Sequence, residues 1–320
     1  MRALVRAYVG GGAPVGSTTL AHTLPVKLSS ASIRNTMAEL TALALIEQPH
    51  TSAGRVPTEA GLRIFVDVLV DRHDVVGWER RLIAHELDEA ASDVSLRVVS
   101  ELLSEHTRQL GFAVLPRLDR VALRHLHLIR ISSERVLVVL VSRAGVTYQR
   151  VIRDTRSGDQ AQLGRVEAEL NQRLAGHTLP ELRALLAREN EAVLLAAIEA
   201  LSAEASARGD VIVAVRATLF AQPEFHDPER LRELLAALET NEALVAILDR
   251  VLGQPGVAVT FGGEVEVPQL RDCAVVSAAC GGEGRPLGLV GVLGPSRMDY
   301  GRVIPLVDLF SRLVTEKLSA

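Results

Sequence analysis

The chain has 320 residues, of which 48% are hydrophobic and 23% charged, and its net charge is −4 at neutral pH. This length predicts about two or three domains, and the composition excludes a largely disordered protein. The sequence contains no apolar run of about 18 residues and no signal-peptide layout, so we expect no membrane contact and a cytoplasmic location. The two cysteines, Cys273 and Cys280, are too few for a disulfide framework and lack the spacing of a zinc site.

The N-terminal residues predict two short helices and a longer third one. Residues 2–9 form the first helix, the glycines at 10–12 break it, and Ser17 caps a second helix that ends before Pro25. In the third helix, apolar residues recur every three or four positions, which predicts one buried face: Ile33, Met37, Leu40 and Leu43. Ser29 or Ser30 supplies its N-cap. Two helices joined by a turn in this way predict a helix-turn-helix.

The opposite face of the third helix carries Ser32, Arg34, Asn35 and Thr36 near its N-terminal end. Arginine can form a bidentate contact with guanine and asparagine with adenine, and the N-terminal residues of a recognition helix meet the base edges. The pattern therefore favours a helix that reads DNA. An ordinary surface helix with a solvated polar face fits the same spacing, so the alternative stays open at this point.

A short strand at 46–49 and a polar turn at 50–55 follow, which is the profile of a wing. Thr58 then caps a helix whose apolar positions are predicted to pack on the same domain: Leu62, Phe65, Val66 and Leu69. These elements predict a winged helix-turn-helix over residues 1–74. Residues 1–58 carry a net charge of +3 (five basic minus two acidic side chains). A basic head on an acidic body is suited to phosphate attraction at the head alone.

The rest of the chain predicts an α+β body. Residues 77–111 read as a linking helix. Strands are predicted at 121–131, 135–142 and 146–152, helices at 158–174 and 179–205, and a strand at 210–215. Helices at 228–238 and 240–252 lead to strands at 256–261, 273–279 and 287–293 and to a last helix at 301–318.

Five segments resemble the HrcA family of heat-inducible transcription repressors: PVGSTTL at 14–20, SSASIRNTMAEL at 29–40, QPHTSAGRVPTEAG at 48–61, QPEF at 222–225 and GVLGPSRMDYGRVIPLVD at 291–308. The resemblance implies a winged-helix head at 1–74, a linker helix at 75–111, a discontinuous GAF-like body at 112–154 and 226–320, and a dimerising insertion at 155–225. It also implies a homodimeric repressor of heat-shock genes. Such a repressor binds an inverted-repeat operator and depends on a GroE-type chaperonin.

On this reading Arg34 and Asn35 contact bases, and the other contacts to DNA come from polar residues of the helices and the turn: Ser17, Thr18, Thr19, Ser30, Ser32, His50, Ser52 and Arg55. Base contacts specify the site and backbone contacts position the protein. The apolar helices of 159–206 are the expected dimer seam.

We expect no enzyme activity, metal or cofactor. His125 and His127 share a strand face but have no third ligand at ligand spacing. The glycine-rich stretch 280–288 lacks the lysine of a P-loop, and we find no complete catalytic set near Arg297 and Asp299. The remaining alternative is a regulator whose GAF-like body binds a small molecule.

Overall fold

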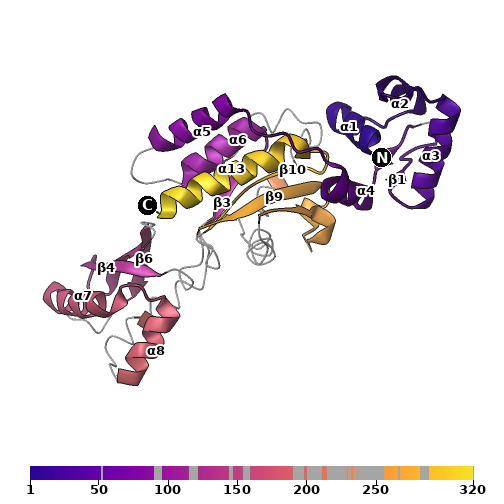
Figure 1. Ribbon diagram of the computed structural model, residues 1–320. Helices are drawn as coiled ribbons and strands as arrows, with labels where there is room; N and C mark the ends of the chain where they lie inside the picture. Colours follow the sequence, from indigo (N-terminus) through magenta and orange to yellow (C-terminus); the bar gives the residue numbers. More distant parts are fainter. Residues whose placement is uncertain are drawn as a thin grey trace.

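The structure is a computed structural model of the chain. It describes residues 1–51, 53–89, 96–114, 122–143, 147–153, 159–189, 198–199, 211–214, 256–265, 267–281 and 288–319, together with 229, 232, 233 and 236. These residues form a mixed helix-and-sheet protein with a helical head, a sheet-based body and a second, smaller sheet unit (Figure 1).

The head contains α1 (Arg2–Gly11), α2 (Ser17–Thr23), α3 (Ser30–Ala42) and a hairpin of β1 (Ile46–Glu47) and β2 (Val56–Pro57). Its apolar core takes one or two residues from most of these elements: Leu4, Val15, Leu20, Ile33, Met37 and Ile46. The predicted face of the third helix is correct for Ile33 and Met37. It is wrong for Leu43, which lies at the C-cap and is 67% exposed. The prediction that Ser17 caps α2 is also wrong, because Gly16 is the N-cap and Ser17 begins the helix.

The helix that follows the hairpin, α4 (Glu59–Ile64), continues as the π-helical turn η1 (Phe65–Leu69). Thr58 caps it as predicted, since its hydroxyl oxygen accepts the backbone N–H of Gly61 at 3.1 Å. The predicted packing of its apolar residues on the head alone is wrong. Phe65 and its neighbours Leu62 and Val66 are buried in the core of the body. A head this small has too little apolar surface of its own to cover a second helix face.

The body is built on a five-stranded antiparallel sheet in the order β7-β3-β10-β9-β8. Its strands are β3 (Leu110–Val114), β7 (Val211–Ala214), β8 (Val257–Phe261), β9 (Cys273–Cys280) and β10 (Gly288–Pro295). Helices α5 (Gly77–Glu89), α6 (Leu96–Thr107) and α13 (Tyr300–Ser319) form a layer beside this sheet (Figure 1). At Gly111 a Cβ atom would lie 2.0 Å from the Ser100 carbonyl oxygen, so α6 approaches β3 more closely than any side chain would permit.

The prediction of one linking helix over 75–111 is wrong in part. This region contains two helices, and Leu110 and Gly111 already belong to the central sheet. The amphipathic pattern of α6 serves to cover that sheet, since Val99 and Leu103 are fully buried in the core of the body. The strands predicted near 256–261, 273–279 and 287–293 and the last helix are confirmed within one or two residues.

A separate unit contains β4 (Leu123–Arg130), β5 (Arg135–Ser142) and β6 (Thr147–Arg153), paired in that order, with α7 (Gln160–Leu174) and α8 (Leu179–Glu189) on one side. Its apolar cluster joins the inward residues of the strands with those of the helices, including Leu126, Leu140, Leu170 and Leu182. Among the described residues, this cluster shares no member with the core of the body.

Side chains of α7 cap the outer edge of β4. Asn171 accepts the N–H of Leu126 and donates to its carbonyl, both at 2.8 Å. Glu167 accepts the N–H of Leu128 at 2.8 Å, and Gln160 donates to the Leu128 carbonyl at 3.0 Å. These amide and carboxylate groups bond the backbone where a further strand would otherwise pair.

This topology corrects the predicted partners of the strands. The strands of 121–152 were assigned to the body and instead form their own sheet with α7 and α8. The strand near 210–215 was assigned to the insertion, and β7 pairs with β3 in the sheet of the body. Strand pairing depends on contacts that are distant in sequence, which local patterns do not specify. The helices predicted at 228–238 and 240–252, the second half of the helix at 179–205 and the segment QPEF lie wholly or mostly outside the described residues.

Candidate nucleic-acid interface

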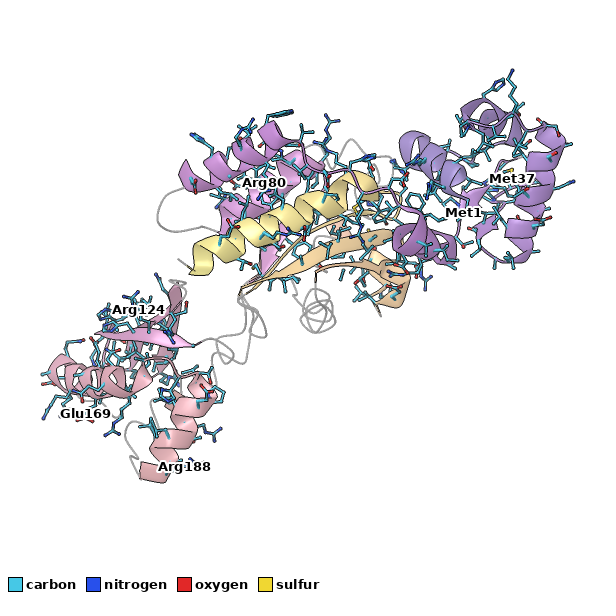
Figure 2. The ribbon with its side chains drawn as sticks, in the orientation of Figure 1. Met1, Met37, Arg80, Arg124, Glu169 and Arg188 are labelled. Atoms are coloured by element: carbon cyan, nitrogen blue, oxygen red, sulfur yellow. The ribbon has the colours of Figure 1, made fainter. Side chains whose placement is uncertain are left out.

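Helix α3 is held in the head by its apolar face and its N-cap. Ile33 is 4% and Met37 6% exposed, and the Ser29 hydroxyl oxygen accepts the N–H of Ser32 at 3.1 Å. Side chains at positions 34 and 35 are then directed away from the core by the helical repeat. Figure 2 shows Met37 inside the head, with the side chains of the opposite face of α3 extending outward.

Arg34 and Asn35 are exposed, and the structure gives neither side chain a hydrogen bond or ion pair within the described part of the chain. Two neighbours differ. Ser32 shares a hydrogen bond with the Ser29 hydroxyl at 3.0 Å, and Thr36 donates to the Ser32 carbonyl at 3.3 Å. Of the polar residues on this face, Arg34 and Asn35 are therefore the ones whose donors and acceptors remain available to a base edge.

Helix α2 contacts α3 and carries Thr18 and Thr19. Both are exposed, whereas Ser17 and Ser30, the first residues of α2 and α3, are half-buried. Leu20 anchors α2 in the core of the head at 5% exposure. The structure thus shows α2 and α3 packed on one apolar core.

The predicted DNA-contacting residues of the hairpin differ in exposure. His50 is exposed at the turn, where its carbonyl accepts the N–H of Ala53 at 2.9 Å. Arg55 lies at the base of the hairpin, is half-buried and exchanges two backbone hydrogen bonds of 2.9 Å with Val15. Ser52 lies outside the described residues.

Sequence reasoning missed Gln48, which organises this turn. Its side-chain amide donates to the carbonyls of Thr51 at 2.9 Å and Ala53 at 3.0 Å. The signal was available, since an amide side chain directly before a polar turn that contains proline and serine can bond the backbone of that turn.

The charge of the head is smaller on its outer surface than the sequence total indicates. Arg2 and Arg6 both pair with the Asp71 carboxylate, Arg2 at 3.6 Å. Their charge is partly neutralised beside the body, which leaves Lys27, Arg34 and Arg55 as the other cations of the head. A modest positive field at the head therefore depends on few side chains.

His125 and His127 stack edge to face at 4.6 Å, and His127 contacts the Glu167 carboxylate at 3.1 Å, but the described residues contain no group of three metal-binding side chains. A cavity of about 420 Å³ is lined by Arg124, Arg143, Ala175 and Gly176 of the smaller sheet unit. None of the described helices is long and apolar enough to cross a membrane.

A small helical head with an exposed polar helix, carried by a larger mixed body, is compatible with a regulator of transcription. The family model for the HrcA protein C-terminal domain matches residues 93–304. The chain belongs to the HrcA family.

Its relatives cover almost the full chain. The protein named heat-inducible transcription repressor HrcA from Desulfitobacterium hafniense is 31% identical and covers 100% of this chain and 96% of its own length. The protein of the same name from Xanthomonas axonopodis is 37% identical and covers 96% of this chain and 91% of its own length. The one from Nitratidesulfovibrio vulgaris is 38% identical and covers 98% of this chain and 92% of its own length. These names are those of repressors and do not favour the ligand-sensing alternative.

A solved structure described as a hypothetical protein shares the fold. It covers 99% of this chain and 95% of its own at 21% identity, with a TM-score of 0.60. The likeness supports the fold seen in the described residues.

Proposed function

We propose that the protein is a heat-inducible repressor of chaperone genes whose head is a winged helix-turn-helix that places α3 in the major groove of operator DNA. The observation that carries this is the exposed pair Arg34 and Asn35 near the N-terminal end of α3, on a chain of the HrcA family. The hairpin β1–β2 is the wing, and the five-stranded body corresponds to the GAF-like domain.

In this proposal Arg34 and Asn35 read bases. The remaining residues contact phosphate or the adjacent groove and set the register: Ser17, Thr18, Thr19, Ser30, Ser32, His50, Ser52 and Arg55. Because Arg55 is half-buried and His50 is exposed, we assign the outer contact of the wing to His50.

Fluorescence anisotropy with DNA from upstream of the organism's own chaperonin genes tests this proposal. Arg34→Ala or Asn35→Ala should cost about 1 to 3 kcal/mol on that DNA and much less on random DNA. The matched control is Arg97→Ala, which removes an exposed arginine of α6 paired with Glu101. Equal losses on both DNAs would assign the two residues to phosphate, and no preference for the upstream DNA in the unmodified protein would refute the function.

We further propose that the protein binds an inverted repeat as a homodimer, because two heads related by symmetry read two half-sites at a fixed separation. The apolar residues of α7 and α8 are buried within their own unit, so they are not free to form the dimer interface predicted on these helices. We propose instead that the interface lies on the face of the β4–β6 sheet that α7 and α8 do not cover. There Ile129, Leu137 and Val151 are paired neighbours across three strands, and Ile129 is 49% and Val151 48% exposed.

Val151→Glu should convert the dimer into a monomer in sedimentation-velocity experiments, since a charge within an apolar seam is desolvated without a partner. The control is Glu169→Ala on α7, an exposed position away from this face. A dimer that survives Val151→Glu would place the seam elsewhere.

Finally, we propose that a GroE-type chaperonin supports the active form. The family supplies this idea, and the topology of the body is consistent with it. The sheet joins β3 at residues 110–114 to β10 at 288–295, and such long-range pairing is slow and leaves apolar surface exposed during folding. Refolding with and without chaperonin, followed by titration with operator DNA, tests the partner. An active fraction that does not change with chaperonin would refute it.

A further inference from the structure

Helix α4 is fastened to the turn of Ala44 and Leu45 that follows the reading helix α3, and the Leu45 N–H in turn donates to the Leu40 carbonyl of α3 at 3.0 Å. The Thr58 hydroxyl donates to the Ala44 carbonyl at 2.7 Å, and the Thr58 N–H donates to the Leu45 carbonyl at 3.1 Å. A Cβ atom at Gly61 would lie 2.0 Å from the Leu45 carbonyl oxygen. Only glycine permits this approach, so the first turn of α4 packs tightly against the turn that follows α3.

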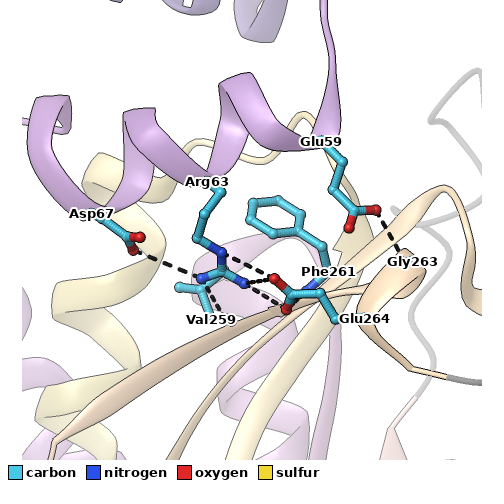
Figure 3. Close-up of polar contacts among 7 residues, drawn as sticks. All are labelled: Glu59, Arg63, Asp67, Val259, Phe261, Gly263 and Glu264. Carbon is cyan, nitrogen blue, oxygen red and sulfur yellow. Dashed lines mark hydrogen bonds and ion pairs between the residues drawn. The ribbon is translucent and has the colours of Figure 1, made fainter. Parts of the chain in front are cut away.

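The other side of α4 is fastened to the body by charged side chains (Figure 3). Arg63 donates to both oxygens of Glu264, from Nε at 3.1 Å and from a terminal nitrogen at 2.6 Å. It also donates to the Val259 carbonyl at 2.9 Å. One turn earlier, Glu59 accepts the Gly263 N–H at 3.1 Å.

This contact has a fixed geometry. The Arg63 guanidinium lies 4.7 Å from the centre of the Phe261 ring, and the Glu264 carboxylate accepts the Phe261 N–H at 3.0 Å. The Arg63 and Glu264 side chains are only 30% and 33% exposed. A planar guanidinium held by a bidentate carboxylate and an aromatic face has one orientation, which a single-point contact would not impose.

Apolar burial beneath the ion pair works in the same direction. Leu62, Phe65 and Val66 are each 4% exposed and belong to the cluster that contains Phe261 and Tyr300. Met1 packs against the cores of both the head and the body, and Figure 2 places it between them.

The first helix of the head has its own attachments to the body. Arg297 of the body donates to the Val9 carbonyl of α1 at 3.3 Å. Arg2 and Arg6 of α1 both pair with Asp71. Two residues after Asp71, the His73 N–H donates to the Gly301 carbonyl of the body at 3.0 Å. Together with α4, these contacts leave the head little freedom to turn against the body.

We propose that Arg63, Glu264 and Glu59 are positioning residues for DNA recognition, which hold α4, and through it α3, at a fixed angle to the body. This inference rests on the proposed function. In a dimer joined outside the head, that angle determines which separation of half-sites both heads can occupy. In this proposal Arg63, Glu264 and Glu59 do not contact DNA themselves. By fixing the angle of the head, they favour operators whose two half-sites have a particular separation.

The angle can be measured without DNA by distance measurements between two spin labels. The labels are attached at Glu39→Cys on α3 and Arg80→Cys on α5, both exposed positions. Cys273 and Cys280 are buried, and burial raises the pKa of Cys280 to about 12, so the native thiols react slowly. Labelled protein is diluted with unlabelled protein so that distances within one chain dominate.

The labelled protein should give one narrow distance distribution. Arg63→Ala should broaden or shift it, and the isosteric Glu264→Gln should do so less. Arg97→Ala, which removes an arginine of the body that does not contact α4, should leave it unchanged. A distribution that stays narrow and unshifted in Arg63→Ala would overturn the proposal, and thermal melts confirm that each variant is folded.

The second measurement compares DNA affinities for a single half-site and for inverted repeats with spacers lengthened by one to several base pairs. Arg63→Ala should bind the half-site as the unmodified protein does, lose about tenfold on the repeat with native spacing, and lose less on altered spacings. Equal losses on half-site and repeat, or an unchanged spacing preference, would overturn the positioning role. If the unmodified protein bound no operator DNA, the proposed function would fail while the label distances still reported on the joint.

Discussion

The head and the β4–β6 unit differ in how they are attached to the body. The head shares α4, Met1 and several hydrogen bonds with the body, and Val5 of α1 lies in the core of the body while its neighbour Leu4 lies in that of the head. The β4–β6 unit has an apolar core of its own, which includes none of the described core residues of the body. The head is therefore built as an extension of the body, and the small sheet unit as a separately packed module.

On the proposed function, this difference corresponds to a head that reads DNA and a small unit that joins two copies. A reading helix that must meet bases at a set distance benefits from rigid mounting, whereas a dimerising module needs only to hold two copies together. Core packing, which is close to that of a crystal, transmits a change of angle better than a chain connection does.

The largest expected effect separates the two kinds of attachment. Phe65→Ala should cost about 3 to 5 kcal/mol and loosen the head and the body together, and Leu170→Ala about 2 to 5 kcal/mol in the small unit alone. Hydrogen exchange measured by peptide mass spectrometry checks this: Phe65→Ala should lower protection in both 1–51 and 257–319, and Leu170→Ala only in 122–189. Faster exchange of the body sheet in Leu170→Ala would break the comparison.

A smaller effect sharpens the role of the body core. Burial raises the pKa of Cys280 to about 12 from 9.0, so folding favours the protonated thiol. The stabilisation is complete below pH about 9 and is lost as the pH rises towards 12, at about 1.4 kcal/mol per pH unit. Burial also raises the pKa of Tyr300, which acts with the same sign at higher pH.

Urea unfolding of the body between pH 8 and about 10.5 measures this loss. Cys280→Ala should flatten the dependence on pH, even though it lowers stability at every pH. The same slope with and without Cys280 would show that the thiol does not couple folding to pH.

The smallest effect compares two helix caps. Thr58→Ala and Ser29→Ala should each cost about 1 kcal/mol, because each hydroxyl caps the N-terminus of its helix. The Thr58 hydroxyl also donates to Ala44 at the joint, so its loss should reduce hydrogen-exchange protection on both sides of α4. The loss at Ser29 should stay within the head. A purely local effect of Thr58→Ala would argue against transmission through α4.

Local patterns predicted much of this structure. The Ser29 and Thr58 caps and the buried pair Ile33 and Met37 follow from spacing within one or two turns. The contact between Arg63 and Glu264 joins residues 201 positions apart, so the local sequence around either residue does not predict its partner. The one local hint was that α4 has more apolar surface than a small head can cover.

The strands of 121–152 teach the same lesson at the level of sheets. Their alternation predicted that they are strands, and β5 indeed buries alternate residues such as Val136 and Val138. Alternation fixes which side chains face inward but not which sheet the strand joins. That choice was made by α7, whose Asn171 and Glu167 bond the edge of β4.

The capped edge of β4 has a consequence for the behaviour of the protein on warming. While α7 is in place, its amide and carboxylate side chains occupy backbone groups of β4 that another strand would use, so a second copy cannot pair with β4 at these positions. Release of α7 would uncover a hydrogen-bonding edge beside an apolar sheet face, the combination from which strand-by-strand aggregation grows. We therefore expect warming that releases α7, and with it Asn171, Glu167 and Gln160, to make the protein prone to aggregate through β4.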